Sequence, residues 1–244
     1  MLIFSNLLHR KIFDLFKIVG LDSFWGDYFD SRFYIASLLS QKKISSILDI
    51  GCGTGVLLHT SNADIKVGLE LSFDSLKEAK KINSEINFIQ GDARYLPFKE
   101  NTFEIILTMH LFPVMKNLKL DWKQAVNEIV RIQISNKSTI IITGANRMSK
   151  YFEKTHKLNY RKSYLTYNEI ADLFKKYFKV NVEGYGPHSK YIMFLLKKII
   201  YKFSDNFSEK LGLDNFLFRF LKNEKYLKDG RSYIIICSNW NDFI

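Results

Sequence analysis

Cysteine and proline are scarce in this sequence, and their scarcity excludes several classes of protein. Two cysteines, Cys52 and Cys237, occur in 244 residues, too few for a disulfide framework or a cysteine-rich zinc site. Three prolines and 12 glycines exclude a collagen-like or proline-rich chain. The charged fraction of 25% is ordinary for globular proteins and argues against wholesale disorder. The composition therefore favours a globular domain with a core of its own.

Long apolar runs are also absent. The stretch Met1–Leu8 is apolar, but it is short, has no basic residues before it and continues into the segment His9–Lys11, unlike a signal peptide. The run Tyr191–Leu196 is far below the roughly 20 residues that a membrane-spanning helix needs. We therefore expect neither a targeting segment nor a spanning helix, and a cytoplasmic location.

Acidic residues are outnumbered by basic ones, mostly in the second half of the chain. The net charge is +11, and residues 46–145 contribute nothing to it. Residues 146–188 carry +5 and residues 189–244 carry +4. Such a basic half suits an acidic partner, namely nucleic acid, an anionic membrane surface or a negatively charged substrate, and it also suits solubility alone.

The middle of the chain alternates β-branched runs with helical patterns. Strands are expected over Ser46–Ile50, Ile65–Leu71, Ile86–Gln90, Phe103–Thr108, Ser138–Thr143, Val180–Gly184 and Tyr233–Cys237. Helices are expected over Val56–Thr60, Phe73–Ile82, Asp121–Ile132 and Tyr167–Tyr177. Near-continuous apolar strands that alternate with helices indicate an α/β fold, in which a parallel sheet is covered by helices on both faces.

Two segments do not follow this alternation. Residues 1–45 are rich in aromatic residues and read as an N-terminal helical cap, and residues 189–230 read as a basic helical insert before the last strand. With the core at 46–188 and the final strand within 231–244, we expect a single domain.

The strongest motif is a glycine-rich turn directly after the first strand. Gly51, Gly53 and Gly55 can adopt positive φ and let a ligand approach bare backbone. The spacing is Gly-x-Gly-x-Gly, and Val56 stands where the dinucleotide fingerprint has its third glycine. Asp49 lies at the strand end, where a carboxylate can face an ammonium group and would repel a pyrophosphate.

Acidic residues also end the next two strands. Glu70 ends the second strand, where a carboxylate can accept hydrogen bonds from both ribose hydroxyls. Asp92 follows the third strand and can accept a hydrogen bond from an exocyclic adenine amine. Together with Asp49, these acids suit a cationic ligand that carries an ammonium, a ribose and an adenine.

Residues 46–144 resemble a class I S-adenosylmethionine-dependent methyltransferase, closest to the small-molecule group that includes the ubiquinone/menaquinone-type enzymes. The resemblance rests on Leu48–Gly55, Gly68–Ser72, Gly91–Phe98 and Phe103–Ile106, four motifs in order at the expected spacing. It implies a Rossmann-like, mostly parallel seven-stranded sheet whose last strand, Tyr233–Cys237, is antiparallel and inserted. A dinucleotide enzyme and a non-catalytic relative are the competing interpretations.

The resemblance also implies S-adenosylmethionine as the cofactor and assigns residues to it. The Asp49 carboxylate and the glycine-turn backbone would hold the methionine part, Glu70 the ribose, and Asp92 with Ala93 the adenine. The residues so assigned are Asp49, Gly51, Cys52, Gly53, Gly55, Glu70, Leu71, Asp92, Ala93 and Met109. Tyr28 or Phe33 of the N-terminal cap would lie near the cofactor.

Methyl transfer from a sulfonium requires alignment rather than a nucleophilic side chain, and a base only when the acceptor arrives protonated. His110, at the end of the fourth strand, is the candidate base, although it can equally be a histidine that takes no part in the reaction. No metal-ligand spacing is present, so no metal is expected, and the remaining histidines are surface or structural: His9, His59, His156 and His188.

The basic insert, residues 189–230, is the part of the sequence that indicates the class of acceptor. Its apolar and lysine positions fall on opposite sides of a helix. This pattern has three interpretations: a lid over the site, a membrane-surface helix or a nucleic-acid surface. The fourth strand lacks the Asn/Asp-Pro-Pro-Tyr/Phe turn of similar enzymes that methylate planar amines. We therefore predict a methyltransferase that acts on a small, lipid-like acceptor, with peripheral membrane contact as one option. An RNA methyltransferase and a catalytically inactive cofactor-binding partner protein are the alternatives.

Overall fold

The computed structural model describes residues 35–36, 38–40, 42–133, 138–146, 165–185 and 232–238. Most of the predicted N-terminal cap and the whole of the predicted insert, including Tyr28, Phe33 and residues 189–230, lie outside the described residues.

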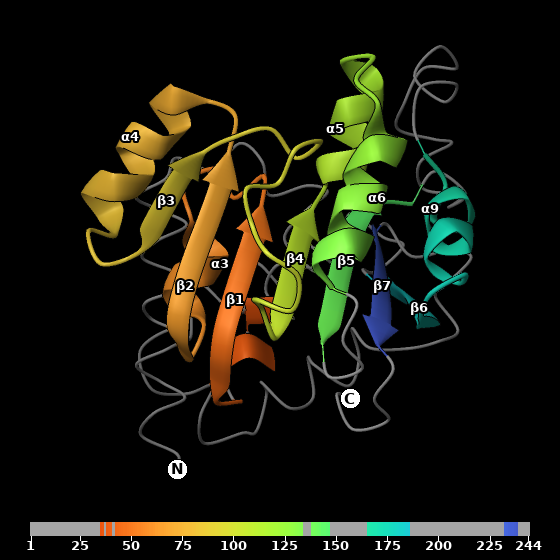
Figure 1. The fold of residues 1–244 in the computed structure, drawn as a ribbon, viewed down its shortest axis with the longest axis horizontal. Coiled ribbons are helices and arrows are strands. Elements are labelled where there is room, and N and C mark those ends of the chain that lie inside the picture. The colour runs from red at the N-terminus through yellow and green to blue at the C-terminus, as the bar shows by residue number, and fades with distance from the viewer. Residues whose placement is uncertain are drawn as a thin grey trace, which may run out of the picture.

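The described strands form one seven-stranded sheet in the order β3-β2-β1-β4-β5-β7-β6 (Figure 1). Their bounds are β1 Ile44–Ile50, β2 Ala63–Glu70, β3 Asn87–Gln90, β4 Ile105–Met109, β5 Thr139–Ala145, β6 Lys179–Tyr185 and β7 Ser232–Ser238. The first five strands pair in parallel, and β7 pairs antiparallel with both β5 and β6. The predicted seven-stranded Rossmann-like sheet with an inserted antiparallel last strand is confirmed.

The bounds of the helices are α3 Val56–Thr60, α4 Phe73–Ile82, α5 Leu111–Asn117, α6 Trp122–Ile132 and α9 Tyr167–Phe174. Side chains satisfy free backbone N–H groups at the start of α4, α6 and α9, whereas Gly55 before α3 and His110 before α5 provide no side-chain cap. Ser72 caps α4 by accepting from the Ser75 N–H at 3.2 Å, and Asp121 caps α6. Thr166 and Glu169 form a reciprocal capping box at α9. Such caps stabilise a helix by about 1 kcal/mol.

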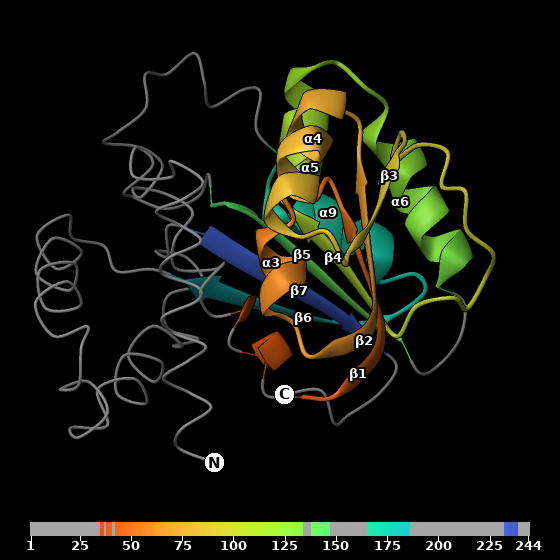
Figure 2. The ribbon, with the colours of Figure 1, turned by 90° about the vertical axis from the view of Figure 1, so that its left-hand side faces the viewer.

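Helices cover both faces of the sheet, as predicted (Figure 2). One apolar core lies between the sheet and α5, α6 and α9, and includes Ile106, Phe112 and Phe174. The other core packs α3 and residues 35, 36, 38 and 39 on the opposite face, against residues such as Ile47 and Leu107. The strands β4 and β5 are buried along their whole length, which explains their unbroken apolar sequence.

The predicted bounds of α3 and α4 are confirmed, and the ends of the other predicted elements differ from the structure by at most three residues. Strand β5 continues to Ala145 because its pairing with β7 continues to Ser232. The last helix before β6 ends at Phe174 rather than at Tyr177. One helix, α5, was not predicted, because it is short and begins directly after β4.

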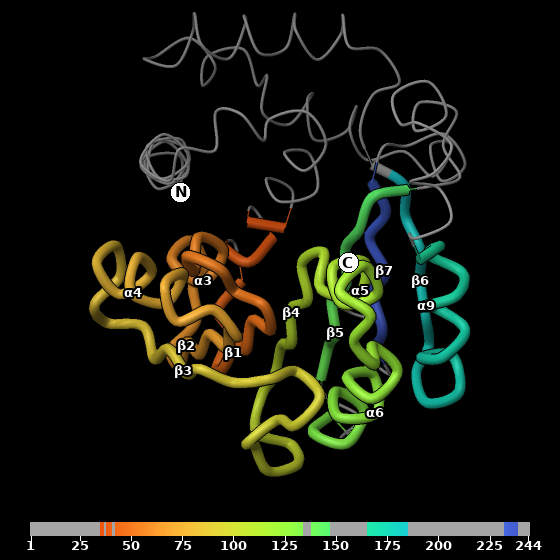
Figure 3. The backbone as a smooth tube through the Cα atoms, turned by 90° about the horizontal axis from the view of Figure 1, so that it is seen from above, coloured from red at the N-terminus to blue at the C-terminus, as the bar shows by residue number. Residues whose placement is uncertain are grey.

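The strand order creates a switch point between β1 and β4. From β1 the chain continues to β2 and β3 on one side, whereas β4 is followed by β5, β7 and β6 on the other. Figure 3 looks onto the edge where the parallel strands end. In open α/β sheets, ligands bind outside this carboxyl edge at the switch point. No helix in the described part of the chain is long and apolar enough to cross a membrane.

Candidate functional site

The glycine-rich turn has the left-handed backbone that its sequence predicts. Gly51, Gly53 and Gly55 have φ of 76°, 55° and 73°, values that glycine adopts without steric cost. A Cβ atom at Gly55 would lie 2.7 Å from the Phe88 ring. At Gly53, by contrast, a Cβ atom would meet nothing within 4 Å, so this part of the turn is open to an approaching molecule.

The turn is held against the end of β2 by backbone hydrogen bonds. The N–H groups of Gly51 and Cys52 both donate to the Leu69 carbonyl, at 2.7 and 3.1 Å. Gly55 donates to the Cys52 carbonyl at 2.9 Å and closes the turn before α3 begins at Val56. The position of the turn is therefore set by β2, the strand that carries Glu70.

Glu70 joins the glycine turn to the start of α4. Its Oε2 accepts from the Gly53 N–H at 3.1 Å, and its Oε1 accepts from the Ser72 N–H at 2.9 Å. A carboxylate offers about four lone-pair sites, so each oxygen keeps the capacity to accept a hydroxyl group as well. The arrangement fits the ribose role that the sequence predicts for Glu70.

The charges of Asp49 and Glu70 both act on the Cys52 thiol. Asp49 is buried at the end of β1, in register with Gly68 of β2. Burial raises the pKa of the Cys52 thiol, and the charges of Asp49 and then Glu70 raise it further. Cys52 therefore stays protonated and is not a nucleophile. A negative electrostatic field at this turn favours a cationic ligand.

Gly68 is a position that sequence analysis did not single out as a steric requirement. A Cβ atom there would lie 2.7 Å from the Cys52 sulfur and 2.8 Å from the Phe88 ring. Glycine at this place lets the turn approach β2 closely. The only signal in the sequence is a glycine inside a strand pattern, which often marks close backbone approach.

Asp92 is paired with a residue that sequence analysis did not identify, Arg94. The Arg94 Nε lies 3.1 and 3.0 Å from the two carboxylate oxygens, and the Arg94 Nη2 lies 2.6 Å from Oδ2. The Arg94 backbone N–H also donates to Asp92, at 2.9 Å. These hydrogen bonds lower the pKa of the Asp92 carboxyl. Ala93, between the two residues in the chain, is buried. Leu71, which follows β2, is exposed.

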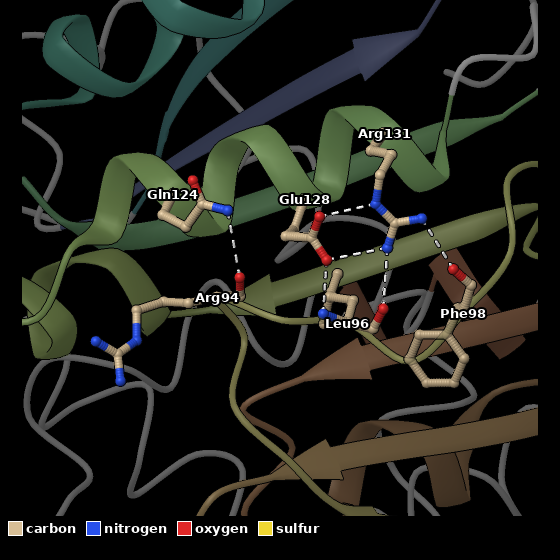
Figure 4. Close-up of polar contacts among 6 residues, drawn as sticks. All are labelled: Arg94, Leu96, Phe98, Gln124, Glu128 and Arg131. Atoms are coloured by element: carbon tan, nitrogen blue, oxygen red, sulfur yellow. Dashed lines mark hydrogen bonds and ion pairs between the residues drawn. The ribbon is translucent and has the colours of Figure 1, made fainter.

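A pair of charged residues on α6 holds the segment that follows Asp92 (Figure 4). Glu128 accepts from the Leu96 N–H at 2.7 Å and from Arg131 at 2.7 and 2.9 Å. Arg131 donates to the carbonyls of Leu96 and Phe98, at 2.9 and 3.1 Å. This Glu128–Arg131 clamp satisfies buried backbone groups of the segment and fixes its path away from β3.

His110 directly follows β4 and has a left-handed conformation, with φ of 60°. Histidine adopts this conformation more readily than most residues other than glycine, but rarely. Its N–H donates to the Thr143 carbonyl at 3.1 Å, and the residue is 8% exposed. A Cβ atom on Gly51 would lie 3.2 Å from the Leu111 side chain. The His110 backbone is thus held beside the glycine turn, at the switch point.

Met109 precedes His110 and is held by its neighbour on β5. The Thr143 hydroxyl lies 3.4 Å from the Met109 sulfur, and the two residues are in register. The structure therefore gathers the predicted residues of β1, β2 and β4 around one turn, with Asp92 and Ala93 at the end of β3. No group of three or more histidines, cysteines or acids in the described residues is placed to hold a metal ion.

Residues 47–133 match the family model described as a methyltransferase domain. Among curated proteins, the chain is 28% identical to ajmaline N-methyltransferase of Rauvolfia serpentina over 44% of this chain and 38% of that protein. The first curated relatives it matches are covered over less than half of their own length.

Solved structures share the fold over almost the whole chain. A protein of Thermotoga maritima, described as an S-adenosylmethionine-dependent and possible histamine N-methyltransferase, is 18% identical, with a TM-score of 0.58 and coverage of 94% of this chain and 98% of that one. The plantazolicin methyltransferase BpumL, solved with S-adenosylhomocysteine, is 19% identical, with a TM-score of 0.55 and coverage of 96% and 95%.

Proposed function

We propose that this chain, which has the class I S-adenosylmethionine-dependent methyltransferase fold and a methyltransferase domain over residues 47–133, transfers a methyl group from S-adenosylmethionine to a small-molecule acceptor. The observation that carries the proposal is the grouping of acidic residues around an open glycine turn at the switch point. Asp49, Glu70 and Asp92 end three neighbouring strands, and Gly53 leaves space beside them.

Each part of the cofactor has a chemical counterpart among these residues. The buried Asp49 carboxylate attracts the ammonium of the methionine part. Glu70 has acceptor capacity left for the ribose hydroxyls while it anchors Gly53. Asp92 accepts from the adenine amine, in place of the Arg94 guanidinium that it now holds. The acidic set also complements the positive sulfonium, which a pyrophosphate cofactor would lack.

The cofactor, when bound, supplies an electrophilic methyl group on a positively charged sulfur. The chain's own contribution is to align the acceptor with that methyl group and to exclude water. His110 follows β4 at the switch point, where it can remove a proton from an acceptor that arrives protonated. Met109, held by Thr143, supplies an apolar wall to the same place.

Calorimetry with S-adenosylhomocysteine tests the cofactor half of the proposal. We expect saturable binding to the wild type and at least tenfold weaker binding to Glu70→Ala, since hydrogen bonds to a charged group contribute about 1.5–3 kcal/mol. Glu85→Ala, an exposed acid before β3, is the matched control and should bind like the wild type. Absence of binding to the wild type would overturn the proposal.

The acceptor class is tested by label transfer. Purified protein is incubated with methyl-tritiated S-adenosylmethionine and a cell extract, and the label is followed into lipid, other small metabolites, RNA and protein. We expect it among the small molecules, and a lipid-like acceptor would place it in the organic phase. Label in RNA would support an RNA methyltransferase instead. Cofactor binding without any label transfer would identify a binding protein that lacks activity.

A further inference from the structure

The strand order divides the carboxyl edge of the sheet into two halves. The acidic residues of the proposed cofactor site follow β1, β2 and β3. The other half is formed by β4, β5, β7 and β6. Since the transferable methyl group would lie at the boundary between these halves, the acceptor belongs on the second half. This assignment rests on the proposed function.

A series of contacts leads from the glycine turn into that second half. Gly51 faces the Leu111 side chain, and the His110 N–H donates to Thr143 of β5 at 3.1 Å. The residue after Thr143 is Gly144, which is paired with Tyr233 of β7. Tyr233 lies near the start of β7. Because β7 runs antiparallel to β5, the start of β7 lies at the carboxyl edge of the parallel strands.

The Tyr233 side chain lies across β5 at Gly144. A Cβ atom on Gly144 would collide with both the ring and the hydroxyl group of Tyr233, so only glycine leaves room for the phenol here. Met109 and Thr143 are in register, which places the following residues, His110 and Gly144, beside each other. The phenol thus reaches from β7 over Gly144, the residue next to His110.

Packing accounts for the Tyr233 ring but not for its hydroxyl group. The ring contacts Tyr167 at 6.1 Å between centroids and belongs to the core beneath α9. The residue is 0% exposed, and its hydroxyl has no hydrogen-bond partner among the described residues. Phenylalanine would fill the same space without burying a polar group. Buried polar groups without partners are rare and call for an explanation.

The Tyr233 hydroxyl also keeps its proton. Burial raises the pKa of the phenol, and the charge of Glu169 raises it further. A protonated phenol is a neutral hydrogen-bond donor at every physiological pH. It suits an oxygen or nitrogen lone pair, and it would discriminate against an acceptor that has only hydrocarbon at that place.

We propose that the Tyr233 hydroxyl binds the methyl acceptor, by donating a hydrogen bond to an oxygen or nitrogen atom near the one that is methylated. Its partner arrives with the acceptor, which explains why the free chain leaves the hydroxyl unsatisfied. The proposed acceptor site would then comprise His110, Gly144 and Tyr233, contributed by three neighbouring strands.

The test is Tyr233→Phe, which removes only the hydroxyl. Label transfer is measured into the small-molecule fraction that the wild type labels, together with the Kd of S-adenosylhomocysteine and the thermal midpoint. We expect kcat/KM to fall at least tenfold, while the Kd stays within twofold and the midpoint is unchanged or higher. The matched control is Tyr177→Phe, an exposed tyrosine after α9, which should match the wild type in all three measurements.

The outcomes separate this proposal from the one on which it rests. Label transfer by Tyr233→Phe at the wild-type rate would overturn the role of the hydroxyl and leave the methyltransferase proposal intact. A large fall in the thermal midpoint would also overturn it, since the hydroxyl would then have a structural partner. Failure of the wild type itself to label any small molecule would overturn both proposals.

Discussion

Gly53 and Gly55 have the same backbone conformation but are required for different reasons. Both have positive φ, which costs any other L-residue about 1–2 kcal/mol. At Gly55 the Phe88 ring adds a steric conflict, whereas nothing crowds Gly53. Close packing thus requires glycine at Gly55, whereas open space lies beside Gly53.

Alanine substitutions separate these two roles. We expect Gly55→Ala to lower the free energy of unfolding by more than Gly53→Ala, with the latter close to the ~1–2 kcal/mol cost of the left-handed backbone. We expect Gly53→Ala to weaken S-adenosylhomocysteine binding more than its loss of stability accounts for. Urea unfolding and calorimetry measure the two effects. Equal stability losses, or unchanged binding by Gly53→Ala, would contradict the assignment.

The catalytic role of His110 is tested best with asparagine, because asparagine tolerates the left-handed backbone found there. If His110 is the general base, we expect His110→Asn to lower kcat about 100-fold or more and to leave the Kd of S-adenosylhomocysteine unchanged. The control is His59→Asn on α3, outside the proposed site. A wild-type kcat for His110→Asn would remove the histidine from the mechanism.

Residues in the glycine motif and at strand ends could be predicted because each is specified by local sequence. Glycines directly after a strand predict the positive φ angles, and the end of the next strand predicts the position of Glu70. Arg94 and Tyr233 could not be predicted in this way. The Arg94 pair depends on a side-chain conformation, and the position of Tyr233 depends on register across strands that are far apart in sequence.

At the scale of elements, the Glu128–Arg131 clamp joins α6 to the segment after β3. Arg131 lowers the pKa of the Glu128 carboxyl through hydrogen bonds. A carboxyl whose pKa is lowered in the folded state stabilises the fold at pH values above the ordinary glutamate pKa of about 4.3. This contribution is lost as the pH falls through the folded-state pKa.

We therefore expect Glu128→Gln to lower the free energy of unfolding by roughly 1–2 kcal/mol at pH 7. The difference from the wild type should shrink below about pH 4, where the wild-type carboxyl becomes protonated. Urea unfolding at both pH values measures it. The control is Glu78→Gln, which breaks an exposed pair of the same i,i+3 spacing with Lys81 and should cost less than about 0.5 kcal/mol. A pH-independent loss would exclude this electrostatic origin.

Sequence patterns predicted elements better than their ends. Apolar runs identified every strand of the sheet, because central parallel strands are buried on both faces. Helix α5 was missed because it has seven residues and contains Pro113 near its start, where proline is tolerated but gives no periodic signal. The clamp could not be predicted, since its hydrogen bonds join residues more than 30 positions apart.

At the scale of the whole molecule, the sheet order confirms the predicted fold, and a methyltransferase family model matches residues 47–133. The narrower ubiquinone/menaquinone-type group stays a prediction. Four ordered motifs specify the half of the sheet that we propose to hold the cofactor, whereas no such motif marks the proposed acceptor half. The acceptor and the roles of the individual site residues therefore remain proposals.

The uneven charge of the chain leads to a test of its partners. The net charge of +11 lies mostly in residues 146–244. If this excess contacts a membrane surface, we expect flotation with anionic vesicles at low salt, little with neutral vesicles, and loss of binding at about 0.5 M salt. Absence of flotation at low salt would exclude the membrane surface as the partner of these basic residues, which would then serve solubility or bind another partner.

Strand β7 has a consequence for synthesis on the ribosome. Among the described strands, β7 alone connects β5 to β6, yet it follows both in the chain. Until residues 232–238 leave the exit tunnel, the nascent chain has a five-stranded sheet with β5 at an unpaired edge and β6 detached from it. Such edges promote pairing with other chains. The nascent chain would therefore depend on chaperones most until β7 joins the sheet.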